Sequence, residues 1–109
     1  MDEIKFHRGY LWPPLQAFIM RAEATDGAWV RCKITFALLR ERLNNPDATQ
    51  ADLHDAVRRD REVFEAVLRN MIDSKDGRPH ALEPCTDQFA AEKLQVVLTP
   101  ESFARFREH

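Results

Sequence analysis

Glycine is scarce in this sequence, and the motifs that depend on it are absent. The chain contains three glycines, Gly9, Gly27 and Gly77, each far from the others. A loop that cradles phosphate needs several glycines close together, because backbone N–H groups must approach the ligand. No G-x-G-x-x-G, P-loop or G-x-S-x-G pattern occurs. We therefore expect neither a phosphate-cradling loop nor a serine nucleophile on a sharp turn.

Cysteine is also rare, with Cys32 and Cys85 as the two examples. A single domain of this length buries about 60 to 70% of the surface that its unfolded form exposes, so its core needs no disulfide or metal ion. Cys32 falls on the apolar face of an expected strand, which favours a buried thiol, and Cys85 follows Pro84 in an expected loop. No internal repeat divides the chain, so we predict one domain over residues 1–109.

Long apolar runs are missing as well. No stretch approaches the roughly 20 apolar residues that a membrane helix requires. The chain starts with the acidic Met1-Asp2-Glu3, and no apolar signal segment follows it. We expect a cytoplasmic protein without a membrane partner.

The sequence also has no excess of positive charge. The formal net charge is −2, whereas nucleic-acid binding needs a concentrated basic face. Arg58, Arg59 and Arg61 form a basic group, but acidic residues lie within one helical turn of it: Asp55, Asp60, Glu62 and Glu65. Pairing between residues i and i+4 on a solvated helix face explains this group. Nucleic acid is therefore an unlikely partner.

The clearest positive signal is a β-hairpin over residues 16–34, QAFIMRAEATDGAWVRCKI. Two runs of alternating apolar and polar residues flank Thr25-Asp26-Gly27, which is typical of two strands joined by a tight turn. A three-residue loop brings apolar side chains together on one face, in the pairs Ala24 with Ala28, Ala22 with Val30, Met20 with Cys32, and Phe18 with Ile34. A two-residue Asp-Gly turn would instead place Arg21 and Glu23 beside apolar residues. We therefore predict the longer loop, with Gly27 in the left-handed conformation.

Two helices are predicted after the hairpin. Thr35 can cap a helix from Phe36 to about Leu43, which Asn44-Asn45-Pro46 ends. Thr49-Gln50-Ala51-Asp52 has the spacing of a capping box, and we expect a long helix from there to about Ile72. The apolar stripe of the long helix consists of Leu53, Val57, Phe64, Val67, Leu68 and Met71.

Asp60 interrupts this stripe near its middle. Either the helix curves there, or the carboxylate meets a partner such as Arg61 or a residue of the sheet. We favour a position at the boundary between two packed patches.

The remaining segments complete an α+β pattern. Ile4–Phe6 is a short strand, and the prolines of Trp12-Pro13-Pro14 end regular pairing after it. Residues 77–93 are mostly loop, with a brief strand at 81–83, and Leu94–Leu98 is the final strand. Thr99 and Pro100 begin a short helix whose Phe103 and Phe106 pack onto the body. We predict a small antiparallel sheet of three or four strands, with the central hairpin 16–34, packed against the long helix and the shorter helices.

Residues that could carry catalysis or bind a metal are isolated in the sequence. None of the four histidines, His7, His54, His80 and His109, has a partner at the spacing of a helical zinc site. His80 and Cys85 could share a metal, but two ligands make a weak site. The hydroxyls of Ser74 and Ser102 lie at helix ends, where they satisfy backbone groups. We therefore predict no catalytic residue, no metal ligand and no cofactor.

Exposed aromatic residues are the strongest functional lead. Trp29 lies on the polar face of the hairpin, and Tyr10 and Trp12 lie in the loop that precedes it. Tryptophan, tyrosine and arginine often anchor protein interfaces. The candidate interaction face consists of Trp29, Arg31, Lys33, Arg21, Tyr10 and Trp12. The alternative interpretation is that the segment from Tyr10 to Pro14 covers Trp29. If this face is uncovered, self-association through it or through a strand edge is expected.

Several of these features together resemble a known family. They are the opening Ile4-Lys5-Phe6, Trp12 before the second strand, the strand Val30-Arg31-Cys32-Lys33-Ile34, Leu39 and Leu43 in the first helix, and the long charged helix to Ile72. On these residues the chain resembles the small bacterial domain-of-unknown-function family 1488, and LQVVLTPESF resembles the closing strand and turn of that family. The connection at 77–93 is longer here. The resemblance implies an α+β fold with an antiparallel sheet and flanking helices, and it carries no activity and no catalytic residue.

Three hypotheses for function follow. The first is a non-enzymatic module that binds a protein partner or itself through the candidate interaction face. The second is weak nucleic-acid binding, in which Arg21, Arg31 and Lys33 contact phosphates and Trp29 stacks on a base. The third is an unrecognised enzyme, for which the minimum sign would be a concave pocket lined by His7 or His80 with a shifted pKa.

Overall fold

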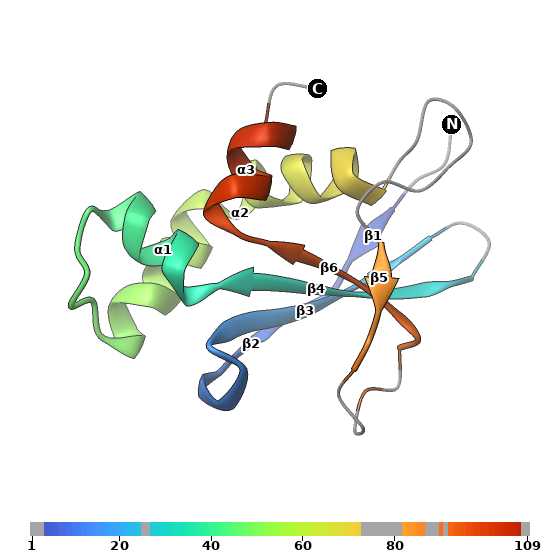
Figure 1. Cartoon of the computed structure of the whole chain (residues 1–109), viewed down its shortest axis with the longest axis horizontal. Helices are drawn as coiled ribbons and strands as arrows, with labels where there is room; N and C mark the ends of the chain where they lie inside the picture. Colours follow the sequence, from blue (N-terminus) through green and yellow to red (C-terminus); the bar gives the residue numbers. More distant parts are fainter. Residues whose placement is uncertain (1–3, 25–26, 73–81, 87–89, 91, 108–109) are drawn as a thin grey trace.

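The computed structural model describes residues 4–24, 27–72, 82–86, 90 and 92–107. The elements are β1 (Lys5–Phe6), β2 (Tyr10–Trp12), the 3₁₀-helix η1 (Pro13–Leu15), β3 (Ala17–Glu23), β4 (Trp29–Thr35), α1 (Phe36–Leu43), α2 (Gln50–Ile72), β5 (Glu83–Pro84), β6 (Leu94–Leu98) and α3 (Pro100–Phe106). Figure 1 shows α1, α2 and α3 on one side of the sheet, so the described part forms two layers.

The β3–β4 hairpin has the predicted register. Ala22 pairs with Val30, Met20 with Cys32, and Phe18 with Ile34. The N–H of Ala24 donates to the carbonyl of Ala28 at 2.9 Å, and Gly27 has a φ of 84° in the left-handed region. Thr25 and Asp26 lie outside the described residues. The prediction of apolar side chains on a single hairpin face is confirmed.

The sheet differs from the predicted one. Within the described residues it has six strands, in the order β1-β3-β4-β6-β5 with β2 also paired to β3. β4 and β6 are parallel, whereas the other pairs are antiparallel. The α+β class is confirmed, but the prediction of three or four antiparallel strands is wrong. Parallel neighbours require a long crossover, and α1 and α2 lie in the connection between β4 and β6.

Two of the additional strands are too short to leave a pattern in the sequence. Tyr10–Trp12, predicted as loop, is β2, which pairs with β3 through Tyr10↔Ile19 and Trp12↔Ala17. The brief strand predicted at 81–83 is β5 at Glu83–Pro84 instead. A strand of two or three residues completes at most one alternation, so periodicity cannot reveal it. The rest of the loop prediction for 77–93 falls partly on residues 77–81, 87–89 and 91, which lie outside the described residues.

The predicted helix boundaries are confirmed. α1 begins after Thr35, whose hydroxyl oxygen accepts from the N–H of Leu38 at 3.2 Å. α2 follows a capping box in which the N–H of Asp52 donates to Thr49 Oγ1 at 3.3 Å and the N–H of Thr49 donates to Asp52 Oδ2 at 3.1 Å. α3 has a second capping box, formed by Thr99 and Ser102. Within the described residues, no helix has an apolar stretch that could cross a bilayer.

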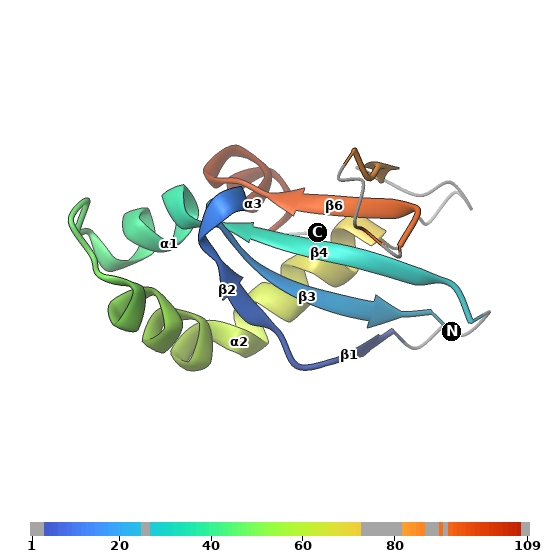
Figure 2. The same ribbon diagram turned by 90° about the horizontal axis from the view of Figure 1, so that it is seen from below.

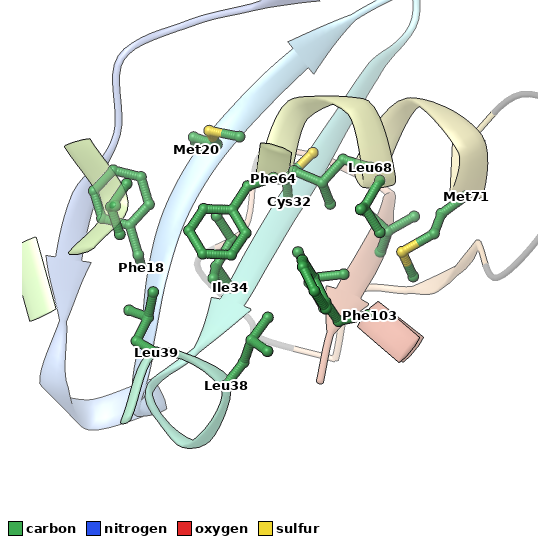
Figure 3. Close-up of a cluster of buried hydrophobic side chains, with 14 of the residues drawn as sticks. Phe18, Met20, Cys32, Ile34, Leu38, Leu39, Phe64, Leu68, Met71 and Phe103 are labelled. Atoms are coloured by element: carbon green, nitrogen blue, oxygen red, sulfur yellow. The ribbon is translucent and has the colours of Figure 1, made fainter. Parts of the chain in front are cut away.

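The apolar face of the hairpin packs against the helices. Figure 3 shows Phe18, Met20, Cys32 and Ile34 facing Phe64 and Leu68 of α2, with Phe103 of α3 beside them. These side chains are buried, and so are the other predicted members of the α2 stripe: Leu53, Val57, Val67 and Met71. The predicted docking of the long helix onto the hairpin is therefore confirmed, and burial of these side chains provides most of the stabilisation.

α2 bends at Asp60, where the backbone has non-helical angles of φ −105° and ψ 17°. The Asp60 carboxylate accepts from Arg59 at 3.0 Å and from Arg42 of α1 at 3.2 Å. The predicted partner Arg61 instead donates to Glu65 and to the backbone carbonyl of His7. The hydrogen bonds from Arg59, together with those from Arg42, hold the pKa of Asp60 below its ordinary value against the opposing effect of burial.

Candidate interaction face

The face of the sheet opposite the helices carries the predicted candidate residues. Side chains alternate between the two faces of a strand, so Arg21, Trp29, Arg31 and Lys33 point away from the core formed by Met20, Cys32 and Ile34. The pairing of β2 with β3 adds Tyr10 and Trp12 to the same side. Figure 2 looks onto this side, with β2, β3, β4 and β6 in front of α2. We call it the outer face.

Two adjoining grooves cross the outer face. The first has a volume of about 570 Å³ and is lined by Tyr10, Trp12, Arg21, Trp29 and Arg31, together with His7, Arg8 and Glu92 among others. The second has a volume of about 370 Å³ and is lined by residues that include Lys33, Trp12 and Arg31. Trp12 and Arg31 line both grooves. All six predicted residues therefore contribute to one continuous surface.

The aromatic side chains form the rim of the first groove. Trp29 is 40% exposed and Tyr10 is 50% exposed. The ring of Trp29 lies 5.0 Å from the ring of His7, and the ring of Tyr10 lies 5.5 Å from that of Trp12. Trp29 thus keeps a large exposed surface, and the segment from Tyr10 to Pro14 does not bury it. Half-exposed aromatic rings beside a groove are suited to contact with an apolar group of a ligand.

Two arginines lie opposite each other in this groove. Arg21 of β3 pairs in register with Arg31 of β4, which places two positive charges on neighbouring strands of one face. Arg21 forms an ion pair with Glu92, and its guanidinium lies 5.8 Å from the centre of the Trp29 ring. The arrangement combines a flat aromatic surface with a guanidinium group held against it.

The position of Arg31 corrects the sequence prediction. Arg31 was expected on an open face, but it is only 6% exposed. The reason is the parallel strand β6, which was not predicted as its neighbour. β6 pairs Gln95 with Arg31, so β4 is a central strand and its outward side chains have neighbours on both sides. Arg31 therefore lies at the bottom of the grooves, and its side chain is a less suitable target for mutation than that of Arg21.

The first groove also contains His7, Arg8 and Glu92. The sequence indicates His7 only as a possible pocket residue of an enzyme, and it does not indicate Arg8 or Glu92 as part of the interaction face. The backbone N–H of His7 donates to the backbone carbonyl of Arg21 at 2.9 Å. In the side chain of His7, Nε2 lies 3.3 Å from Glu23 Oε1. Continuing the alternation of β1 by one residue could have placed His7 on the outer face. Glu92 is 8% exposed, and no local pattern could have located it, because its position depends on the pairing of β6.

The remaining candidates for chemistry lie elsewhere. His54 is exposed on α2, whereas His80, His109 and Ser74 lie outside the described residues. The possible metal site of His80 and Cys85 depends on His80 and therefore also falls outside the described residues. In the described part of the chain, no group of three or more histidine, cysteine, aspartate or glutamate residues is placed to hold a metal ion. The Ser102 hydroxyl donates to the carbonyl of Val97 at 3.0 Å, as expected for a capping residue.

Cys32 is a buried thiol, as predicted. Burial raises its pKa from 9.0 to about 12, because the thiolate would lose its hydration in the core. The described lining of the first groove includes neither serine, threonine nor cysteine. The described lining of the first groove thus presents aromatic surfaces and guanidinium groups, whereas the lining of the second includes the hydroxyl of Thr86.

Comparisons with protein-family models, with curated proteins and with solved structures gave no significant match. The resemblance to the domain-of-unknown-function family 1488 stays a prediction.

Proposed function

We propose that this protein is a non-enzymatic binding module that takes up a segment of another protein on the outer face of its sheet. The observation that carries the proposal is the convergence of Tyr10, Trp12, Arg21 and Trp29 on one groove, with Trp29 and Tyr10 half-exposed at its rim. Aromatic and arginine side chains of this kind dominate the binding energy of protein interfaces. The grooves give these side chains a concave surface to which a partner can be complementary.

The charge of the outer face favours a different protein over a second copy of this chain. Arg8, Arg21, Arg31 and Lys33 line the grooves, and Glu92 supplies the opposing charge. In a two-fold symmetric dimer, each patch would meet the identical patch. Like charges would then be brought together, which opposes association. We therefore propose that self-association does not use this face.

Weak nucleic-acid binding is the alternative, and the stacking of Arg21 on Trp29 is the observation that favours it. A bound strand would place several negative charges along the grooves, where Glu92 already forms an ion pair with Arg21, so a run of phosphates is opposed more strongly than a single carboxylate. The whole chain is also negatively charged. Salt dependence separates the two functions, because phosphate contacts weaken steeply with salt concentration.

We also propose that the chain is a bacterial cytoplasmic relative of the domain-of-unknown-function family 1488. The order of elements supports this relationship: a short strand, a hairpin, a short helix, a long helix, and a final strand and helix. A structure of a family member should then have the strand order β1-β3-β4-β6. A different strand order in that structure would contradict the proposed relationship to the family.

The test of function is a comparison of two exposed apolar residues on opposite sides of the molecule. Trp29→Ala removes the rim of the groove, and Val63→Ala alters an exposed position on α2. Tagged protein is used for affinity capture from a bacterial lysate, and captured proteins are quantified by mass spectrometry. We expect a protein retained by the wild type and by Val63→Ala, and reduced about tenfold or more by Trp29→Ala.

Melting curves must first show that both variants are folded. If Trp29→Ala captures the same proteins at the same level as Val63→Ala, the outer face is not the binding surface. If the capture persists in Trp29→Ala but is lost after nuclease treatment of the lysate, nucleic acid is the better assignment.

A further inference from the structure

We infer that the segment bound on the outer face is acidic as well as apolar, with a carboxylate next to an aromatic or aliphatic side chain. The inference rests on the proposed function and specifies the chemistry of the partner. It follows from the charges of the grooves, from the position of Glu92 and from the aromatic rim.

Among the described residues that line the grooves, positive side chains outnumber negative ones, although the protein as a whole is negatively charged. Three arginines line the first groove, Arg8, Arg21 and Arg31, and Lys33 lies in the second. The described lining of these grooves contains one carboxylate, that of Glu92. The formal net charge of the chain is −2, so the positive excess among these described residues is local. A ligand with negative charge complements this surface, whereas a basic segment would be repelled.

Arg21 is placed to bind a carboxylate. It lies on β3 opposite Arg31 of β4, and it already forms an ion pair with the carboxylate of Glu92. The Arg21 side chain is 55% exposed, so part of its planar guanidinium can be reached from solvent. Arginine can donate two parallel hydrogen bonds to one carboxylate.

Glu92 already uses this chemistry within the molecule. Its carboxylate is buried and forms an ion pair with Arg21. It precedes β6 in the chain and reaches the groove from there. A carboxylate of the partner would share Arg21 with Glu92 or replace it. Glu92 is therefore an internal competitor of the ligand, and removing its charge should strengthen the binding of an acidic segment.

The aromatic rim adds an apolar requirement. Trp29 and Tyr10 expose large parts of their rings at the edge of the groove that contains Arg21. A purely acidic segment would leave these rings in water, whereas a neighbouring leucine or phenylalanine would cover them. Arg21 lies against the Trp29 ring, so the two parts of such a segment would bind side by side.

The test uses the fluorescence of the protein itself. The chain contains two tryptophans, Trp12 and Trp29, and both line the first groove. Their emission therefore reports on the proposed site. The probe is a short capped peptide in which glutamate and leucine alternate, and the matched peptides contain lysine with leucine, and glutamate with serine. We expect a saturable change for the glutamate–leucine peptide, and binding about tenfold weaker or undetectable for the other two.

Three substitutions distinguish the proposed contact from general attraction between charges. Arg21→Gln should weaken the binding of the glutamate–leucine peptide about tenfold, the loss expected for one charge-assisted hydrogen bond. Glu92→Gln should strengthen it, because the internal competitor loses its charge. Arg58→Gln removes one charge from an exposed position on α2 and should leave the affinity unchanged. Thermal melting identifies any variant that is not folded. If one of Arg21→Gln and Glu92→Gln does not fold, the peptide affinity of the other variant tests the inference.

Several results would overturn the inference. One is the absence of a saturable change with the glutamate–leucine peptide at millimolar concentration. Equal binding of the lysine–leucine peptide is another, and so is equal weakening by Arg21→Gln and Arg58→Gln. Tighter and strongly salt-dependent binding of a short oligothymidine would assign the grooves to nucleic acid. If the peptide fails while Trp29→Ala still abolishes protein capture, the inference fails and the proposed function stands.

Discussion

At the scale of single residues, the two cysteines differ in a way that a simple reaction can detect. Burial raises the pKa of Cys32 to about 12, so its thiol stays protonated at neutral pH and cannot act as a nucleophile. Cys85 is partly exposed. We expect iodoacetamide to modify Cys85 and to leave Cys32 unmodified in the folded protein at pH 7 to 8. Peptide mass spectrometry checks this result, with modification of both thiols in denaturant as the control.

Gly9 has a packing role that its backbone angles do not reveal. A Cβ atom at this position would lie 2.6 Å from Cε1 of Phe18 and would also collide with the carbonyl oxygen of Ile19. The carbonyl belongs to β3 and cannot move aside. Gly9→Ala should therefore destabilise the fold by about 1–3 kcal/mol, as overpacking of a core does. Urea denaturation measures the change, and an unchanged midpoint would contradict the close approach of Gly9 to β3.

At the scale of elements, the bend of α2 lies at Asp60. Hydrogen bonds from Arg59, and also from Arg42, lower the pKa of its carboxyl in the folded state. The contribution of the charged carboxylate to stability is therefore complete above the unfolded value of about 3.9 and is lost as the pH falls through the lower folded value.

Asp60→Asn removes that charge while it keeps the size of the side chain. We expect a loss of about 1–3 kcal/mol at pH 7, because Asp60 is largely buried and accepts charged hydrogen bonds. The difference from the wild type should shrink as the pH is lowered below about 3.9. Urea denaturation at both pH values tests this, and a difference that stays constant with pH would assign the loss to packing.

Most elements could be predicted because local signals define them. Thr35 and Thr49 mark the starts of helices through their hydroxyl groups, and the alternation in 16–34 has one register that keeps Phe18 and Ile34 on the same face. The pairing of β4 with β6 could not be predicted, because the contact joins residues about sixty positions apart through a crossover. Strands as short as β5 also leave no periodic pattern.

The positions of the candidate-site residues follow the same division between local signals and contacts of distant residues. The residues of the hairpin, Arg21, Trp29 and Lys33, follow from its register. Glu92 and the burial of Arg31 depend on β6 and could not be found in the sequence. Local alternation therefore places these hairpin side chains on one face of the hairpin, whereas the depth of the grooves and the ion pair between Arg21 and Glu92 depend on the tertiary structure.

At the scale of the whole molecule, the α-helices of the described residues all lie on one side of the sheet, and the grooves lie on the other side (Figure 2). If the grooves on that side are complementary to another protein, the isolated chain should be a monomer. We expect the mass of one chain in light scattering at micromolar concentration. A dimer that Arg21→Glu dissociates, with Arg58→Glu as the control, would mean that the outer face binds a second copy instead.

The most direct test of the account is to observe the two tryptophan side chains while a partner binds. Trp12 and Trp29 give two indole N–H signals in a ¹⁵N-labelled sample, and both residues line the first groove. On titration with the captured partner protein or with the glutamate–leucine peptide, we predict that both indole signals shift and that the backbone signals around Val63 on α2 do not. Shifts confined to α2, with both indole signals unchanged under saturating ligand, would contradict the assignment of the outer face as the binding surface.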